Sequence, residues 1–181
     1  MVKVVLVAQV FNMKHTKKDY SMIVRNFTFG VEDSLVSTVG LLAGIGVAGL
    51  GKSQIIVTGL VLIFVEAFSM AVGSLLSEQS VQEYEVHREV GFSKSITAAI
   101  VMFMSYVLAG LIPLSPFFYS ASHASILVSV ALTLVSLFLL GVVNARMFRV
   151  RAWRDGLFTL LMGGIAVGVG IAVGQIAGHI G

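Results

Sequence analysis

Five long apolar stretches, nearly free of charged side chains, constrain the fold of this chain more than any other feature. A helix needs roughly 20 apolar residues to cross the hydrocarbon core of a bilayer, and each stretch reaches that length. Lipid offers the backbone no hydrogen bonds, so such stretches must be helical, and their continuous apolar character excludes the alternating strands of a barrel. The stretches cover residues 27–50, 54–76, 96–118, 122–143 and 156–180. We therefore predict an all-α, polytopic membrane protein with five transmembrane helices.

Composition agrees with this class and removes several others. The apolar fraction is 57%, only 12% of residues are charged, and the mean hydropathy is +0.97, above what a soluble domain carries. Cysteine is absent, which excludes disulfides, zinc-thiolate sites and iron–sulfur ligation. No nucleophile lies beside a base and no glycine loop suits phosphate, so we expect no enzyme activity, no resident cofactor and no nucleic-acid partner.

Basic residues predict how the chain is oriented in the membrane. Of the 12 lysines and arginines, all except Lys52 fall on one side of the predicted spans. Positively charged loops stay in the cytoplasm, so we expect a cytoplasmic N-terminus and a C-terminus outside the cell or in an organelle lumen. The arginines after the fourth span, with Trp153, are interpreted as topology determinants and anchors for anionic membrane lipid. The sequence does not distinguish the cell membrane from an organellar one.

The predicted spans divide the chain into two parts. Residues 1–25 form a cytoplasmic N-terminal segment, and residues 26–181 form the five-helix transmembrane domain, which includes a short acidic cytoplasmic connection at 77–95. Residues 4–11 are apolar but too few to span a bilayer, and we expect an interfacial helix there or an extension ahead of a start at Met13. The third helix is predicted to end near Pro113.

Three acidic residues lie within predicted spans: Glu32 and Asp33 in the first, and Glu66 in the second. A carboxylate at the bilayer centre costs about 2.5–3.5 kcal/mol on insertion scales, so each needs a reason to be there. Glu32 is near enough to the cytoplasmic end either to reach the interface or to join a site. Glu66 precedes Glu78 by roughly 18 Å of helix, so we expect it to face a polar interior.

Met70 lies four residues after Glu66, on the same face of the second span, at a depth similar to that of Asp33. A methionine in an apolar helix usually fills space, but beside carboxylates its thioether shifts the preferred metal from Mg²⁺ or Ca²⁺ toward Fe²⁺ and Mn²⁺. The candidate metal ligands are therefore Asp33, Met70, Glu66 and Glu32.

Acidic residues also recur in the connection between the second and third spans. Glu78, Glu85 and Glu89 follow helical spacing on one face. Two interpretations stay open: these residues gather metal at the cytoplasmic mouth, or they belong to a solvated extension of the second helix.

Two segments resemble the vacuolar iron transporter family. GVEDSLVSTVGLLAGIGVAG is similar to that family's first helix, and EAFSMAVGSLLSEQS to its second, while GLIPLSPFF and the glycine-rich fifth span resemble later parts. The resemblance covers nearly all of residues 26–178. It implies a homodimeric, proton-coupled Fe²⁺/Mn²⁺ carrier whose pathway lies at the dimer interface between first and second helices, with Asp33 and Met70 matching the family's aspartate and methionine.

The sequence departs from the family pattern in three places. Ser34 replaces the glycine after the aspartate, Ser74 stands where many members carry a glutamate, and the connection at 77–95 is much shorter than the family's acidic cytoplasmic domain. Glu66 is a candidate substitute for the glutamate missing at position 74. The short connection weakens the expectation of metal capture and leaves the membrane pathway intact.

A homodimer also makes physical sense, because one subunit supplies too few ligands and two-fold symmetry would double Asp33 and Met70 around one axis. Gly40 and Gly44 form a Gly-x-x-x-Gly pair suited to close helix packing, within the bundle or between subunits. We therefore expect a carrier that exports Fe²⁺ or Mn²⁺ from the cytoplasm by proton antiport. The alternatives are a carrier of another divalent cation, Ca²⁺ or Mg²⁺, and a membrane scaffold or accessory subunit that transports nothing.

Overall fold

The computed structural model describes residues 2–148 and 152–178, and within these ranges the chain forms five α-helices and no strand. Each helix contains a stretch long and apolar enough to cross a membrane, which confirms the predicted fold class and number of spans. The helices are α1 (Val2–Val47), α2 (Lys52–Val86), α3 (Ser93–Leu114), α4 (His123–Phe148) and α5 (Ala152–Gly178), with a short 3₁₀ helix η1 (Ser115–Phe118) after α3.

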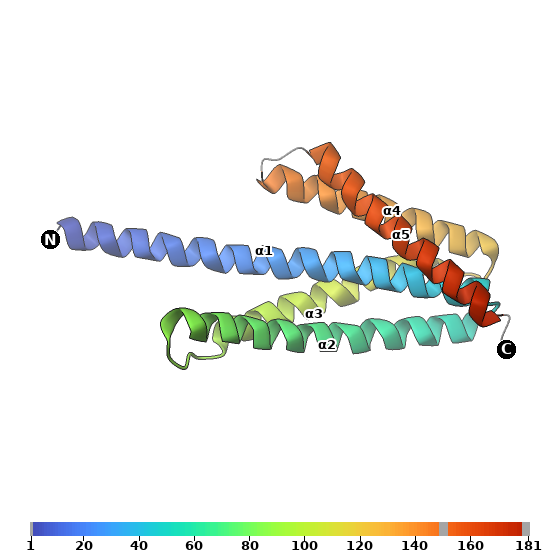
Figure 1. Ribbon diagram of the computed structural model, residues 1–181, viewed down its shortest axis with the longest axis horizontal. Helices are drawn as coiled ribbons and strands as arrows, with labels where there is room; N and C mark the ends of the chain where they lie inside the picture. The colour runs from blue at the N-terminus through green and yellow to red at the C-terminus, as the bar shows by residue number, and fades with distance from the viewer. Residues whose placement is uncertain (1, 149–151, 179–181) are drawn as a thin grey trace.

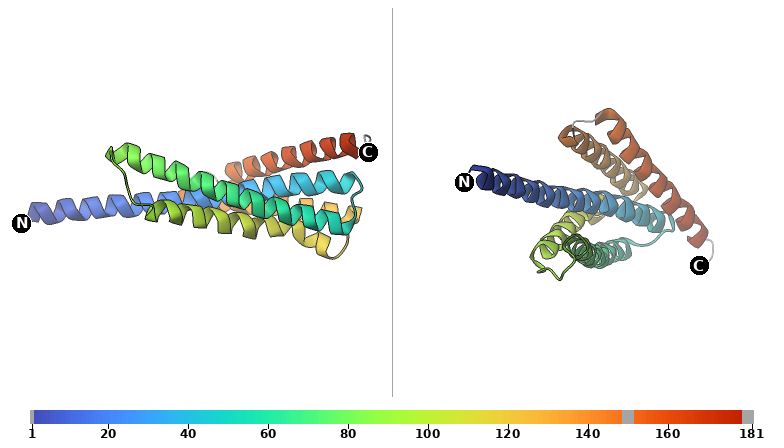
Figure 2. Two further views of the ribbon diagram at one scale, coloured as in Figure 1. Left: turned by 90° about the horizontal axis from the view of Figure 1, so that it is seen from below. Right: turned by 60° about the vertical axis from the view of Figure 1, so that its left-hand side comes forward.

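Helix α1 is the centre of the bundle and contacts all four other α-helices (Figures 1 and 2). The α2–α3 pair packs on one side of α1, and the α4–α5 pair packs on the other. Helix α1 begins at one end of the molecule and α5 ends at the opposite end, as an odd number of spans requires. We call the end with the α2–α3 connection, residues 87–92, the loop end, and the end with the α1–α2 connection, residues 48–51, the turn end.

Helix α2 is longer than its apolar pattern predicts. At the turn end, the backbone N–H of Gly51 donates to Gln54 Oε1 at 3.0 Å and so satisfies one donor at the start of the helix. At the loop end the helix passes the predicted boundary at residue 76 and stops where His87 adopts a left-handed conformation with φ 52°. Most of the connection predicted at 77–95 is therefore helix.

The other boundaries follow from similar local chemistry. Helix α1 continues without a break through the predicted boundary at residues 25 and 26, so the N-terminal segment extends the first span as helix from Val2. Helix α3 ends one residue after Pro113, close to the predicted position. The carbonyl oxygen of Pro113 accepts a hydrogen bond of 2.6 Å from Ser129 Oγ, which joins α3 to α4.

Glycines allow α1 and α5 to meet backbone to backbone. A methyl group at Gly170 would overlap the main-chain carbonyl of Gly40, one at Gly174 would overlap that of Gly44, and one at Gly44 would come within 2.6 Å of the Gly170 oxygen. Only hydrogen fits at such contacts, and the gain is close van der Waals packing between helices in lipid. The predicted helix-packing role of Gly40 and Gly44 is thus seen against α5 of the same chain.

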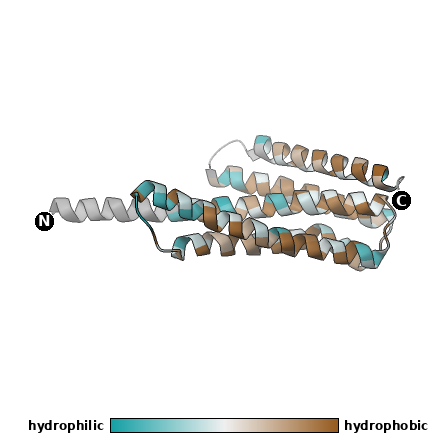
Figure 3. Ribbon diagram, turned by 60° about the horizontal axis from the view of Figure 1, so that its bottom comes forward, coloured by the Kyte–Doolittle hydropathy of each residue, from teal (hydrophilic) through white to brown (hydrophobic). Residues whose placement is uncertain are grey.

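Large apolar side chains cover the outside of the bundle. Phe68 on α2, Leu127 on α4 and Ile176 on α5 each expose more than half of their surface. Figure 3 shows hydrophobic residues along the middle of the helices and hydrophilic ones concentrated toward their ends. A water-soluble monomer rarely exposes so continuous an apolar surface, whereas lipid is the matching solvent for it.

Candidate metal site within the membrane helices

Asp33 on α1 and Glu66 on α2 lie close enough for their charges to interact. Both side chains are half-buried, and both helices are membrane spans at these positions. The sequence alone did not determine whether the first two spans present their carboxylates to each other. A cation bound between two such carboxylates would offset their mutual repulsion, so the pair is a candidate cation site.

Glu32 is the neighbour of Asp33 in the chain, and the charges of these two carboxylates also interact. Its side chain, however, lines a different cavity, which is formed along α1 with Tyr20, Thr28 and Phe29. The charges of Asp33 and Glu66 therefore interact between α1 and α2, whereas Glu32 lines a separate cavity along α1.

Tyr106 on α3 holds Glu66 by a direct hydrogen bond, its hydroxyl donating to Glu66 Oε2. The same hydroxyl lies 2.7 Å from Ser37 Oγ on α1, and the Tyr106 side chain is completely buried. One phenol thus links three helices at the level of the carboxylate pair. Sequence reasoning missed this residue, although a tyrosine in the middle of an apolar span needs a polar partner and so gives a usable signal.

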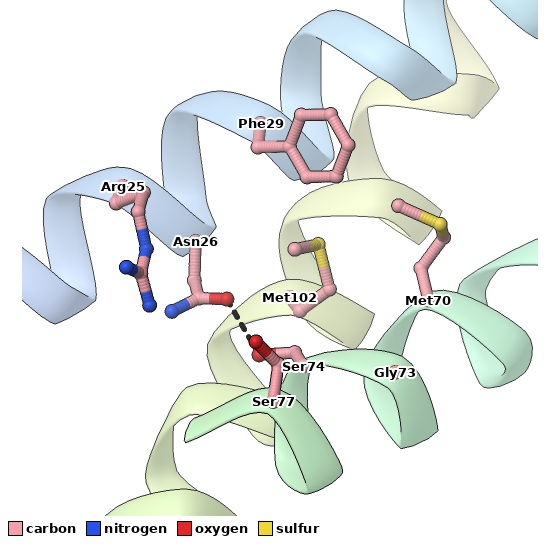
Figure 4. Close-up of a pocket in the computed structure, with 8 residues that line it drawn as sticks. All are labelled: Arg25, Asn26, Phe29, Met70, Gly73, Ser74, Ser77 and Met102. Carbon is pink, nitrogen blue, oxygen red and sulfur yellow. Dashed lines mark hydrogen bonds between the residues drawn. The ribbon is translucent and has the colours of Figure 1, made fainter. Parts of the chain in front are cut away.

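Met70 lines a cavity of about 510 Å³ between α1, α2 and α3, on the loop-end side of the carboxylates (Figure 4). A second thioether, that of Met102 on α3, lines the same cavity beneath the ring of Phe29. The polar groups around it come from α1 and α2, and Ser74 Oγ donates to Asn26 Oδ1 at 2.5 Å. The full lining consists of Arg25, Asn26, Phe29, Met70, Gly73, Ser74, Ser77 and Met102.

Glu66 lines a third cavity, which we call the turn-end groove. This groove has a volume of about 460 Å³ and reaches from Ser37 and Glu66 to Ala48 on α1 and Ala177 on α5. Glu66 and Met70 are neighbours on α2, yet their side chains line different cavities. Asp33 and Glu66 therefore lie between the Met70 cavity on the loop-end side and the turn-end groove on the other side.

The described part of one chain holds too few ligands for a complete metal site. Among the described residues, no three His, Asp or Glu side chains gather closely enough to hold a metal ion. A divalent metal usually takes more than two protein ligands, so Asp33 and Glu66 need additional donors from water or a second subunit.

The acidic residues at the loop end have separate surroundings. Glu78 is buried and accepts a 2.7 Å charged hydrogen bond from Arg25 on α1. Glu85 is exposed and lines a small cavity near Asp19 and Glu78, while Glu89 is exposed beyond the end of α2. The prediction that Glu78, Glu85 and Glu89 share one helical face is wrong for Glu89, because the left-handed residue at position 87 ends the helix before it.

The described fold and carboxylate pair define an integral, multi-pass membrane protein with ionisable groups inside its spans. The sequence model of the VIT family matches residues 24–90 and 81–175, and the chain belongs to this family. The chain is also similar to vacuolar iron transporter 1 from Oryza sativa subsp. japonica, with 31% identity over 90 residues. That alignment covers 46% of this chain and 36% of the rice protein, so it spans about a third of the relative's length. The family resemblance read from the sequence motifs is confirmed.

Proposed function

We propose that this chain is a membrane carrier for divalent transition metal, Fe²⁺ or Mn²⁺, which it exports from the cytoplasm in exchange for protons. The observation that carries the proposal is the interacting pair Asp33 and Glu66 on two membrane helices, between the Met70 cavity and the turn-end groove. Membership of the VIT family supports a metal substrate. A carrier role also fits the expected lack of enzyme activity.

The carboxylate pair is costly unless it has a cation to hold. Each ionised carboxylate near the bilayer centre costs about 2.5–3.5 kcal/mol on insertion scales, and the like charges of Asp33 and Glu66 add repulsion. A divalent cation would neutralise both charges at once, and protons would do so when the cation leaves. Metal ligation needs deprotonated carboxylates, so binding and proton release are linked. This linkage is the physical basis of the proposed antiport.

A soft donor on the approach to the carboxylates favours transition metals. Met70 and Met102 present thioethers to the cavity on the loop-end side, beside hydroxyl and amide oxygens. A thioether binds Fe²⁺ and Mn²⁺ better than it binds Mg²⁺ or Ca²⁺. With the loop end in the cytoplasm, as the basic residues predict, a metal would pass Met70 before it reaches Asp33 and Glu66.

The homodimer expected from the sequence would complete the ligand set. Two copies around a two-fold axis near α1 and α2 would supply two Asp33 and two Glu66 carboxylates, together with two Met70 thioethers. Four carboxylates are enough to hold a divalent metal at one site, and the two thioethers would line the approach to it. The half-exposed position of Asp33 and Glu66 leaves them accessible to a partner along this side of the bundle.

Transport by purified protein tests the proposal directly. The chain would be reconstituted into liposomes, and Mn²⁺ and Fe²⁺ flux measured with a pH gradient across the membrane. Asp33→Asn and Glu66→Gln should each reduce flux to near the level of empty liposomes. Asp19→Asn is the matched control, because Asp19 pairs with Lys94 at the loop end, away from the carboxylate pair. Flux that survives the combined Asp33 and Glu66 substitutions would refute this pathway, and a wild-type protein without flux would favour a scaffold or accessory subunit.

One observation favours a second candidate, a carrier of Ca²⁺ or Mg²⁺. Glu66 accepts a hydrogen bond from Tyr106, whose hydroxyl also contacts Ser37, and it interacts with the charge of Asp33. The thioether of Met70 lines a different cavity. All-oxygen surroundings suit hard cations. Competition among Fe²⁺, Mn²⁺, Ca²⁺ and Mg²⁺ in one reconstituted preparation separates the two candidates. If the protein is a hard-cation carrier, Ca²⁺ or Mg²⁺ should reduce the measured Mn²⁺ flux most strongly.

A further inference from the structure

The hydroxyl of Tyr106 has a direction that can be deduced from its two partners. It donates to Glu66 Oε2, and it lies 2.7 Å from Ser37 Oγ. A phenol has a single proton, and here that proton is given to the carboxylate. Ser37 must therefore donate its own proton to the Tyr106 oxygen. The hydrogen bonds therefore run from Ser37 on α1 to Tyr106 on α3 and from Tyr106 to Glu66 on α2. Each hydroxyl donates in the direction of the Glu66 carboxylate.

The backbone and ring of Tyr106 hold this hydroxyl in place. The side chain has no exposed surface, and its main-chain carbonyl accepts a hydrogen bond of 2.6 Å from Ser34 Oγ on α1. Ser34 is fully buried as well. Both ends of the tyrosine are thus fixed against α1, whereas Glu66 is a flexible side chain on a helix whose outer face is exposed to lipid. The tyrosine is the rigid partner of this pair, and the glutamate is the mobile one.

The conformation of the Glu66 side chain decides which groups its carboxylate can contact. Its carboxylate interacts with the charge of Asp33 and also lines the turn-end groove. Without a fixed partner the glutamate side chain has several staggered conformations available to it. The hydrogen bond to Oε2 restricts these conformations and leaves Oε1 for another ligand.

We propose that Tyr106 is a positioning residue of the cation site: it fixes Glu66 beside Asp33 so that one carboxylate oxygen remains for the transported divalent cation. This inference deepens the proposed function and rests on it. Tyr106 acts through Glu66 and needs no contact of its own with the cation. Ser37 supports the same geometry, because it donates to the tyrosine oxygen and so strengthens the bond to the carboxylate.

The test uses variants that remove only a hydroxyl. Tyr106→Phe keeps the buried ring and the main-chain bond to Ser34, and it removes the bond to Glu66. The matched control is Tyr119→Phe, since Tyr119 is almost fully exposed at the turn end and contacts Lys52 through its main-chain carbonyl. In reconstituted liposomes, Tyr106→Phe should raise the KM for Mn²⁺ about ten-fold and change the maximal rate little, as expected for a lost hydrogen bond to a charged group. Tyr119→Phe should match the wild type.

A double-mutant cycle separates positioning from a merely structural role. Equilibrium Mn²⁺ binding would be measured on purified wild type, Tyr106→Phe, Glu66→Ala and the double variant. If Tyr106 acts through Glu66, its substitution should weaken binding in the wild-type background and have no further effect in the Glu66→Ala background, which lacks the acceptor. An equal loss in both backgrounds overturns the proposal, and so does a Tyr106→Phe protein that binds and transports like the wild type.

A last variant covers the case in which Tyr106→Phe does not fold. Ser37→Ala removes the outer hydrogen bond and leaves the tyrosine in place, so it should raise the Mn²⁺ KM in the same direction by a smaller factor. A normal KM for Ser37→Ala in that case would overturn the proposal. A wild-type protein that moves no cation overturns the proposed function, whereas a transporting wild type with unchanged tyrosine and serine variants overturns this inference alone.

Discussion

Arg25 on α1 donates to the carboxylate of Glu78 on α2 at 2.7 Å, and the two partners differ greatly in exposure. The Arg25 side chain is 63% exposed, whereas that of Glu78 is 8% exposed. Arg25 also lines the cavity that contains Met70. The ion pair therefore neutralises a nearly buried anion on α2 and holds a cationic group beside the cavity. In this position the arginine has two roles, one in the stability of the bundle and one in the electrostatics of the cavity.

The first prediction concerns the stability of this pair. Arg25→Ala leaves the Glu78 carboxylate without its partner, and the cost of an unsatisfied buried acceptor is about 1–3 kcal/mol. Because Arg25 is mostly exposed, water will replace part of the lost interaction, and we expect a value near the lower limit. Chemical unfolding of the protein in detergent measures it. Arg88→Ala, at an exposed position beyond α2, should leave stability unchanged. Equal stability of Arg25→Ala and wild type would contradict the assignment.

The second prediction concerns the close packing of α1 and α5. Gly170→Ala places a methyl group on the backbone of Gly40, and neither helix can relieve this overlap by moving a side chain. We expect a loss of about 1–3 kcal/mol in the free energy of unfolding, the usual range for overpacking. Gly168→Ala is a matched control on the same helix, because nothing lies within 4 Å of its added methyl group. Its stability should equal or slightly exceed that of the wild type. A similar loss in both variants would mean that the two helices do not meet as described.

The third prediction concerns the choice of metal. Met70→Leu keeps the size of the side chain and removes the sulfur, so the fold should tolerate it. If the thioether favours transition metals, Fe²⁺ and Mn²⁺ flux should fall several-fold while any Ca²⁺ flux stays constant. Met104→Leu is the control, since Met104 lies on the exposed outer face of α3. Unchanged flux of all metals in Met70→Leu would favour the hard-cation candidate.

The fourth prediction concerns orientation. The absence of cysteine makes the chain a natural background for single-cysteine labelling. Ser53 lies exposed at the turn end, and Glu89 lies exposed in the connection at the loop end. In intact cells that carry the protein in the plasma membrane, a membrane-impermeant thiol reagent should label Ser53→Cys and leave Glu89→Cys unlabelled until the membrane is permeabilised. The reverse pattern would show that the positive-inside prediction is wrong.

Most of the fold follows from the solvent in which the chain must reside. The apolar stretches predicted all five spans, because in lipid each must satisfy its backbone internally. Their ends were less predictable. Helix α2 continues to Val86 because its polar last turns are held by bonds that hydropathy does not report, such as those from Gln79 to the Val90 carbonyl and from Ser95 to Gln79. The sequence also did not predict the packing partner of Gly40 and Gly44. Two glycines four residues apart indicate a helix face that allows close packing, but they do not indicate that α5 packs there.

The candidate site was predictable in part. Asp33 and Glu66 stand out because charge is costly in an apolar span, and in the structure their charges interact. Met70 and Glu66 line different cavities, and their spacing did not predict this. A spacing of four residues places two side chains on the same face of a helix, but it does not say which other helices pack against that face. Tyr106 and Met102 were missed for the same reason. They come from α3, and only the packing of that helix against α1 and α2 places them near the carboxylates.

The contact between α1 and α5 limits the motions available to the proposed carrier. Where two backbones touch with only hydrogen between them, rotation or sliding of one helix would make main-chain atoms collide, so we expect the two helices to move as one unit. Helices α1 and α2 contact each other less extensively, through side-chain hydrogen bonds such as the one from Ser74 to Asn26. Opening one side of the carboxylate level and closing the other would therefore displace α2 relative to a fixed α1–α5 frame.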